Sequence, residues 1–156
     1  MTSKKQLSKE EFLDLYKATF RLPTQWGELD LGGHINNVVY MRYFESGRVA
    51  YLQKIVENKR FDFTPVGPVL ASIEVHYKVP LFFPDTITIG TRVINMDEYS
   101  LIMEAAIWSE QHRRITTEAK ARLVFYDFRT QQKAPIPQEV VEGITALDGI
   151  EQQLQG

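Results

Sequence analysis

The sequence predicts an α+β domain in which a long, curved antiparallel sheet wraps around one central α-helix. A heavily apolar helical segment lies early in the chain, at about residues 37–57, and a meander of four long β-type segments follows between about residues 68 and 130. Strands that follow one another directly form antiparallel sheets, and long twisted strands curl. Because a curled sheet can cover an apolar helix on several sides, residues 1–156 are interpreted as one domain.

The first elements are expected to be a short helix and an edge strand. Ser8 and Glu11 have the spacing of a capping box, and apolar side chains follow at helical spacing, so a helix is predicted over about residues 8–17. Residues 18–26 alternate poorly between apolar and polar side chains and contain Pro23, which indicates an edge strand or an extended lead-in.

The later elements are justified by their periodicity. The central helix carries apolar residues on more than one face, so it must be covered on several sides. The last β-type segment has a period of two, which is typical of a strand with one buried face and one solvated face. Its apolar residues, which alternate with Glu118, Lys120, Arg122 and Val124, are Ala119, Ala121, Leu123 and Phe125. The tail predicts a terminal helix over about residues 137–148, because a helix tolerates proline in its first turn.

Composition excludes several classes of protein. The 18 lysine and arginine residues nearly balance the 20 aspartate and glutamate residues, so no nucleic-acid partner is expected. No apolar run is long enough for a signal peptide or a membrane span, so a cytoplasmic protein without a membrane partner is expected. The chain has no cysteine, which excludes disulfides and thiol nucleophiles, and neither a metal nor a cofactor is predicted.

The densest polar cluster is ELDLGGHINN, residues 28–37, which ends where the central helix is expected to begin. The first amides of a helix lack internal acceptors and lie at the positive end of its dipole, so they can bind an anion or a developing oxyanion. Asn36 is the expected N-cap, which places the amide of Asn37 in the first turn. Gly32 and Gly33 allow the backbone to approach a ligand closely or to adopt a positive φ.

The segment DLGGHINNVVYMRYFESGR, which starts at Asp30, resembles the D-x-x-x-H-[IV]-N-N-x-x-Y-x-x-[YW]-x-[ED] segment of hotdog-fold acyl thioesterases of the 4-hydroxybenzoyl-CoA thioesterase type. The similarity extends over about residues 20 to 140. It includes a Y-x-x-P step, a D-x-[IL]-x-[IV] strand opening and a late A-x-x-x-x-[VF]-[FY]-x-D-x-x-T pattern followed by I-P. In this chain these are Tyr77 to Pro80, Asp85 to Ile89, Ala119 to Asp127 with Thr130, and Ile136 with Pro137.

The resemblance implies the hotdog fold, a homodimer formed by pairing two sheets edge to edge, and an acyl-CoA or acyl-carrier thioester bound at the dimer interface. In that family the carboxylate matching Asp30 acts as nucleophile or general base, and the helix-start amide, at or near Asn37, polarises the thioester carbonyl. His34 matches a histidine that many members keep beside the carboxylate, and it either orients Asp30, contacts the thioester or only forms a hydrogen bond within the loop. Plant acyl-carrier thioesterases have an asparagine where this chain has Gly32, so a role for the asparagine side chain does not carry over to this chain. Another branch places its carboxylate on the central helix, where Glu45 is the alternative.

Five further residues are predicted to bind substrate, each with a structural alternative. Gly33 either lets the backbone approach the ligand or only shapes the turn, and Asn36 either contacts substrate or only caps the helix. Tyr40 is spaced either for the core or for acyl contact. Glu74 and His76 alternate with apolar residues in a strand, so they border the acyl pocket of a partner subunit or lie on a solvated face.

The remaining charged residues are assigned a structural role or two alternative roles. Glu45 and Arg48 are one helical turn apart and are expected to form an ion pair that supports the interface. His112 lies in QHRR, which is interpreted as a hairpin tip, and no role is assigned to it. Four basic residues either meet the phosphates of CoA or only keep the surface solvated, namely Arg113, Arg114, Lys120 and Arg122.

These groups suit thioester hydrolysis on independent grounds. A thioester is already activated, so hydrolysis needs a positioned carboxylate and donors aimed at the oxyanion, without a metal or redox cofactor. The predicted function is an acyl-CoA thioesterase that releases a free carboxylic acid and CoA. The alternatives are a non-catalytic acyl-CoA or acyl-carrier binding module, an acyl-carrier-protein thioesterase and a dehydratase of the same fold. A pair of dimers forming a homotetramer is left open.

Overall fold

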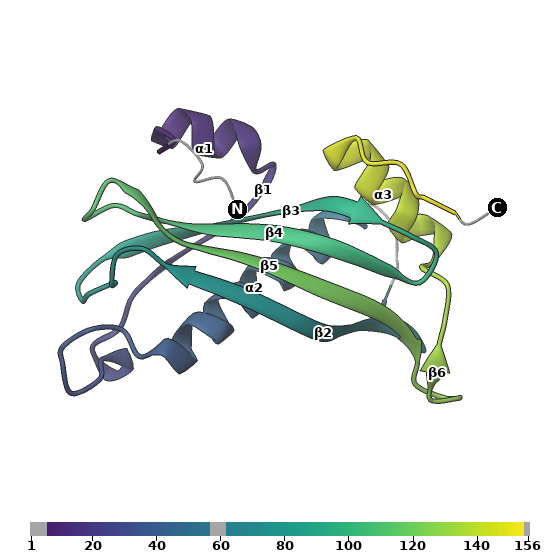
Figure 1. Ribbon diagram of the computed structural model, residues 1–156, viewed down its shortest axis with the longest axis horizontal. Helices are drawn as coiled ribbons and strands as arrows, with labels where there is room; N and C mark the ends of the chain where they lie inside the picture. The colour runs from purple at the N-terminus through teal and green to yellow at the C-terminus, as the bar shows by residue number, and fades with distance from the viewer. Residues whose placement is uncertain (1–5, 57–61, 155–156) are drawn as a thin grey trace.

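The computed structural model describes residues 6–56 and 62–154 and has the predicted α+β architecture. A six-stranded antiparallel sheet curves around the long helix α2, with five strands in the order β1-β3-β4-β5-β2 and the short β6 paired to β5 (Figure 1). Strand β1 (Ala18–Pro23) is at one edge, as the position of its proline predicts, and β2 (Val66–Tyr77) is at the other. Both edges lack a neighbouring strand among the described residues.

The helices lie close to their expected positions. Helix α1 (Lys9–Leu15) begins after Ser8, which forms the capping box with Glu11, and η1 (Trp26–Glu28) is a single 3₁₀ turn. Helix α2 (Asn37–Ile55) begins at the expected residue, whereas the last expected positions, from residue 57 on, lie outside the described residues. Helix α3 (Gln138–Asp148) begins one residue later than expected, because Pro137 is its N-cap and keeps an extended ψ.

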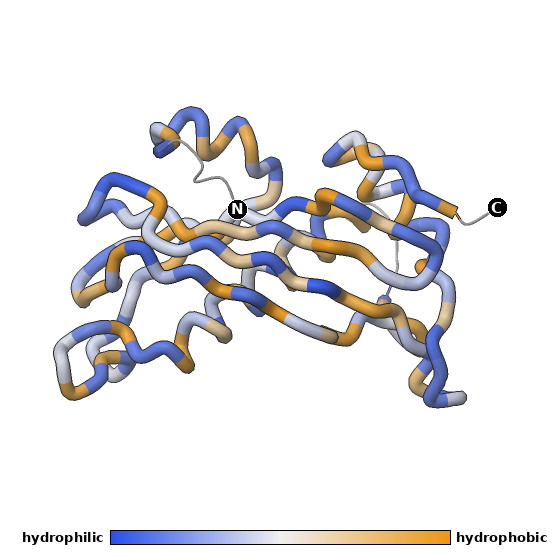
Figure 2. Tube along the Cα trace, in the orientation of Figure 1, coloured by the Kyte–Doolittle hydropathy of each residue, from blue (hydrophilic) through white to orange (hydrophobic). Residues whose placement is uncertain are grey.

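Only three of the four long strands expected in the meander are successive neighbours, because β2 crosses over to pair with β5; these three and the short β6 follow β2 in the chain. They are β3 (Thr86–Met96), β4 (Ser100–Ser109), β5 (Arg114–Asp127) and β6 (Gln132–Lys133). Hydrophobic and hydrophilic residues alternate along the long strands, which gives the sheet two different faces (Figure 2). In β4, for example, Ala105 and Ile107 face α2, whereas Ala106 and Trp108 face α1. The sheet therefore buries one face against α2 and part of the other against α1.

Two apolar clusters fill the space between α2 and the sheet. The first half of α2 buries Tyr43 and Phe44 against β3, β4 and β5, and the facing residues are Ile87, Ile89, Ala105, Ile107 and Ala119. The second half buries Tyr51 and Leu52, and α3 covers it through Val140 and Ile144. Because each side chain of this size stabilises the fold by roughly 1.5–3 kcal/mol on burial, α2 is firmly fixed. The position of the N-terminus of α2 relative to the sheet is consequently well defined.

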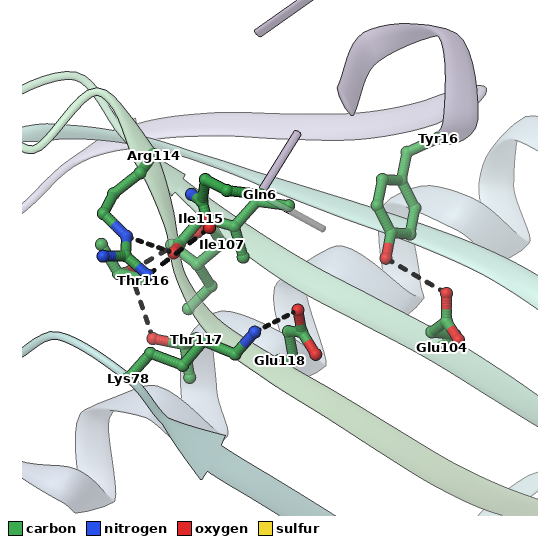
Figure 3. Close-up of polar contacts among 10 residues, drawn as sticks. All are labelled: Gln6, Tyr16, Lys78, Glu104, Ile107, Arg114, Ile115, Thr116, Thr117 and Glu118. Carbon is green, nitrogen blue, oxygen red and sulfur yellow. Dashed lines mark hydrogen bonds and ion pairs between the residues drawn. The ribbon is translucent and has the colours of Figure 1, made fainter. Parts of the chain in front are cut away.

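The face of the sheet opposite α2 carries polar pairs. Lys78 Nζ is 2.9 Å from Glu118 Oε1, and the Tyr16 hydroxyl donates to Glu104 Oε1 at 3.4 Å (Figure 3). His76 is directly opposite Glu118 in the strand register, so it lies on this same face. There His76 Nε2 is 2.6 Å from Glu74 Oε1, and both side chains are exposed. Glu74 and His76 therefore point away from α2.

Buried tyrosines, among them Tyr16, Tyr43 and Tyr51, make stability sensitive to alkaline pH. Burial raises the pKa of Tyr51 far above its ordinary value of about 10, and its hydrogen bond to Asp148 acts in the same direction. Burial also raises the pKa of Tyr16 and Tyr43, assisted by the charge of Glu104 and by the hydrogen bond to Glu28, respectively. Above pH 10 the unfolded chain therefore loses protons that the folded chain retains, and stability falls as the pH rises.

Each such tyrosine is expected to reduce the free energy of unfolding by about 1.4 kcal/mol per pH unit once the pH exceeds about 10. Tyr51→Phe removes one of these groups, so the stability of this variant is expected to fall less steeply with pH by that amount. Urea unfolding of both proteins between about pH 10 and 11.5 measures the two slopes. Equal slopes in the two proteins contradict this account of Tyr51.

Candidate active site

The polar segment that precedes α2 forms a compact turn. Leu29 and Ile35 pair as an isolated antiparallel bridge, and the Asp30 amide donates to the His34 carbonyl oxygen at 2.8 Å. Asp30 Oδ1 accepts the amides of Gly32 at 2.8 Å and of His34 at 3.2 Å. Gly33 has a φ of 80°, which side-chain-bearing residues rarely adopt, so glycine is required there. The carboxylate of Asp30 thus holds the turn together.

The two oxygens of the Asp30 carboxylate have different surroundings. Oδ1 accepts both turn amides, whereas Oδ2 has no hydrogen-bond partner among residues 6–56 and 62–154. The residue is exposed in the single chain, so Oδ2 is accessible. Asp30 therefore combines the structural role of a turn residue with one oxygen that is available for chemistry.

His34 lies next to Asp30, but its ring does not bond to the carboxylate. A Cβ placed on Gly32 would lie 3.3 Å from Asp30 Oδ1 and 3.6 Å from His34 Nδ1, so the two side chains flank this glycine. The ring of His34 instead packs on Phe82, with 4.9 Å between the ring centroids. Only the backbone amide of His34 contacts the carboxylate, so His34 orients Asp30 through the main chain.

The start of α2 leaves one amide free. Asn36 is the N-cap: its Oδ1 accepts the Val38 amide at 3.1 Å and its carbonyl oxygen accepts the Val39 amide at 2.9 Å. The Asn37 amide has no acceptor in the described part of the chain, and Asn37 is exposed. At the positive end of a helix of 19 residues, this amide is the available donor.

Tyr40 is a buried residue of α2 that packs beneath the turn. It is 3% exposed, its hydroxyl accepts the Leu81 amide at 3.0 Å, and its ring meets Tyr77 edge-on. Burial raises its pKa, the Leu81 hydrogen bond opposes this shift, and the Asp30 charge adds to it. Tyr40 thus belongs to the core, and it lies close enough to Asp30 for the carboxylate charge to affect its pKa.

A groove of about 390 Å³ runs between α2 and the edge strand β2. Ligand pockets are commonly of this size. Residues at helical spacing line one side and two apolar residues of β2 line the other, namely Val38, Met41, Arg42, Glu45 and Arg48 with Leu70 and Ile73. The sequence analysis missed most of this lining, although the helical spacing of these residues places them on one face of α2. Neither Tyr40 nor the pair of Glu74 and His76 lines the groove.

The expected ion pair between Glu45 and Arg48 does not form in this chain. Glu45 is exposed, and Arg48 has no hydrogen-bond or ion-pair partner among the residues that the structure describes. Partial burial lowers the pKa of Arg48, and the nearby charge of Glu45 opposes this shift. Arg48 therefore lines the groove beside Glu45 without forming an ion pair with it.

Two residues without a predicted role also lie near the turn. Phe82 contacts His34, and the ring of His112 lies 5.6 Å from that of Phe82. His112 Nε2 donates to the Pro80 carbonyl oxygen at 3.0 Å. No local sequence signal indicates these contacts, because the three residues come from three separate loops.

Metal-binding and membrane-spanning features are absent from the described residues. Within residues 6–56 and 62–154, no three histidine, aspartate or glutamate side chains are grouped so that they could hold a metal ion. None of the described helices combines the length and the apolar character that a membrane crossing requires.

Comparisons with known proteins point to one family. The family model described as the thioesterase-like superfamily matches residues 24–144. The chain is 24% identical over 119 residues to the long-chain acyl-CoA thioesterase FadM of Escherichia coli strain K12. The aligned region covers 76% of this chain and 90% of FadM.

Solved structures agree. A thioesterase superfamily protein from Jannaschia sp. CCS1 has a TM-score of 0.79 at 25% identity, over 98% of this chain and 99% of its own. A thioesterase from Thermus thermophilus, complexed with coenzyme A and Zn, has a TM-score of 0.73 at 27% identity, over 87% and 97% of the two chains.

Proposed function

The chain belongs to the thioesterase-like superfamily and is a thioester hydrolase with the hotdog fold, and we propose that it hydrolyses acyl-CoA thioesters to a free carboxylic acid and CoA. The observation that carries the proposal is the arrangement at the N-terminus of α2. There a carboxylate with one free oxygen, Asp30 Oδ2, stands at the same helix end as a free amide, that of Asn37. The groove along α2 starts beside them, at Val38.

In the proposed mechanism the Asn37 amide donates to the thioester carbonyl oxygen and stabilises the oxyanion of the tetrahedral intermediate. Asp30 Oδ2 either takes a proton from a water that attacks the carbonyl carbon, or attacks that carbon itself to form an anhydride, which water then hydrolyses to release the acid and restore the carboxylate. In both routes the C–S bond breaks, and the thiolate of CoA receives a proton. Water supplies the oxygen of the acid and the proton of the thiol. His34, beside Asp30, contacts the thioester in this arrangement.

The acyl chain is placed in the groove between α2 and β2. The lining runs from Val38 to Arg48, which are ten positions apart, so the groove follows α2 for roughly 15 Å at 1.5 Å per residue. An extended chain advances roughly 1.1–1.2 Å per bond, so the groove accepts an acyl chain of about a dozen carbons. Gly33 and Asn36 are proposed to contact the thioester end, and Tyr40 is proposed to support that end from behind.

We propose a homodimer that pairs the two β2 edges. This strand has 12 residues and exposes Val69 and Leu70, and an exposed apolar edge is a site for pairing with another strand. A second β2 would close the open side of the groove, whereas Glu74 and His76, which point away from α2, would lie on the opposite face of the joined sheet. Two such dimers can associate further into a tetramer. The cytoplasm, where acyl-CoA is available, is the proposed compartment.

The test is turnover with a panel of acyl-CoA thioesters from butanoyl-CoA to hexadecanoyl-CoA, together with benzoyl-CoA. Release of thiol is followed with a thiol-reactive dye, and many turnovers per protein molecule are expected on at least one substrate. Binding without release supports the non-catalytic module instead. Hydrolysis of acyl-carrier thioesters alone supports an acyl-carrier-protein thioesterase.

A further inference from the structure

One aromatic ring connects the two histidines at this end of the molecule. Phe82 lies in the segment between β2 and β3, and its ring is 4.9 Å from that of His34 and 5.6 Å from that of His112. The three residues come from the loop before α2, the β2–β3 connection and the β4–β5 hairpin tip. A contact among three separate loops fixes their relative positions. Phe82 remains 39% exposed, so its ring lies at the surface beside the Asp30 turn.

The backbone around Phe82 is fixed to the elements that flank the turn. The Leu81 amide donates to the Tyr40 hydroxyl at 3.0 Å, and the Leu81 carbonyl oxygen accepts the Ile35 amide at 2.8 Å. The Phe82 carbonyl oxygen accepts the Thr24 hydroxyl at 2.9 Å. The position of the Phe82 ring is therefore defined relative to the start of α2.

His112 is held to the same segment from the other side. Its amide donates to Ser109 Oγ at 3.0 Å, and Ser109 Oγ donates to Asp85 Oδ2 at 2.5 Å. Asp85 is only 6% exposed, and its Oδ1 accepts the Gln111 amide at 3.0 Å. Together with the bond from His112 Nε2 to the Pro80 carbonyl oxygen, these bonds tie the hairpin tip to both ends of the segment that carries Phe82.

The His34 imidazole depends on this support. In the described part of the chain its ring has no hydrogen-bond partner, and its ring contact is with Phe82. A ring without hydrogen bonds is oriented by packing alone. Resting on the function proposed above, we propose that Phe82 is a positioning residue, braced by His112, that holds the His34 imidazole beside Asp30 in the orientation used for thioester hydrolysis.

The test compares Phe82→Leu with Phe83→Leu. The second variant changes the neighbouring phenylalanine, which is similarly exposed at 42% and has no ring contact with a histidine among the described residues. Phe82→Leu is expected to lower kcat roughly two- to tenfold with little change in KM, because an aromatic pair contributes in this range. Phe83→Leu is expected to leave kcat unchanged. Phe82→Tyr keeps the ring and is expected to restore most of the activity.

NMR of the imidazole groups provides a readout that is independent of activity. The chain has three histidines, so each ring signal can be assigned by replacing one histidine at a time with glutamine. Phe82→Leu is expected to shift the ring signals of His34 and His112 but not that of His76, which lies on the opposite face of the sheet. An unmoved His34 signal, or a kcat equal to that of Phe83→Leu, overturns the positioning role.

The two proposals fail in different ways. If the unsubstituted protein hydrolyses no thioester, the proposed function fails, and a His34 signal that does not respond to Phe82→Leu still refutes the contact. If Asp30→Asn abolishes activity and folded Phe82→Leu keeps full kcat, only the positioning role fails. Thermal unfolding of each variant establishes that it is folded before kcat is compared.

Discussion

Asp30→Asn is expected to lower kcat for thioester hydrolysis by about 10²–10⁴-fold while leaving the fold unchanged. The asparagine carbonyl oxygen can still accept the amides of Gly32 and His34, which hold the turn through Oδ1 in the unsubstituted protein. The change removes the negative charge and replaces the free oxygen, Oδ2, with an amide nitrogen that can neither attack a carbonyl nor accept a proton. Thiol release across the acyl-CoA panel measures the effect.

Asp97→Asn is the matched control for this variant. Asp97 also holds a turn with its carboxylate, because its Oδ1 accepts the amides of Tyr99 and Ser100 in the β3–β4 hairpin. It lies outside the turn before α2 and does not line the groove. Asp97→Asn is therefore expected to affect stability only. A folded Asp30→Asn protein with full activity on every substrate refutes the assigned role.

Asn37→Pro is expected to lower kcat by about 10²–10³-fold, which is the effect of removing one oxyanion donor. Proline has no amide hydrogen, and it is tolerated at the first position of a helix. The preceding residue, Asn36, already has φ −62° and ψ 138°, which suits a residue before proline. The helix is therefore expected to form with its donor deleted.

Asn37→Ala separates the amide from the side chain. It keeps the backbone N–H and removes only the carboxamide, so its activity is expected to stay close to that of the unsubstituted protein. Circular dichroism of both variants checks that α2 is intact. Equal losses in the proline and alanine variants indicate that the side chain, and not the amide, acts on substrate.

Local features of the site could be predicted because neighbouring residues determine them. Asn36 caps α2 because a short polar side chain can accept an amide two residues later, and Asp30 and Gly33 form the turn for similarly local reasons. The antiparallel pairing of β3 with β4 and of β4 with β5 also follows from their succession along the chain, whereas β2 lies beside β5 and not beside β3, which succession does not predict.

Contacts across the fold could not be predicted in this way. Phe82 and His112 meet His34 only because three loops reach the same end of the sheet, and no spacing within one segment encodes that meeting. The groove is a surface shared by α2 and β2, so its lining depends on how closely the two elements pack. Glu45 and Arg48 have the spacing of an ion pair, but an exposed pair contributes little, and Arg48 instead packs along the groove.

A crystal structure with an acyl-CoA analogue in which a methylene replaces the sulfur tests the central claim most directly. The expected result has the ketone oxygen about 3 Å from the Asn37 nitrogen and Asp30 Oδ2 about 3–3.5 Å from the carbonyl carbon, directly or through one water. The acyl chain is expected between α2 and β2. A carbonyl group bound elsewhere, with Asp30 Oδ2 in contact only with bulk solvent, contradicts the account.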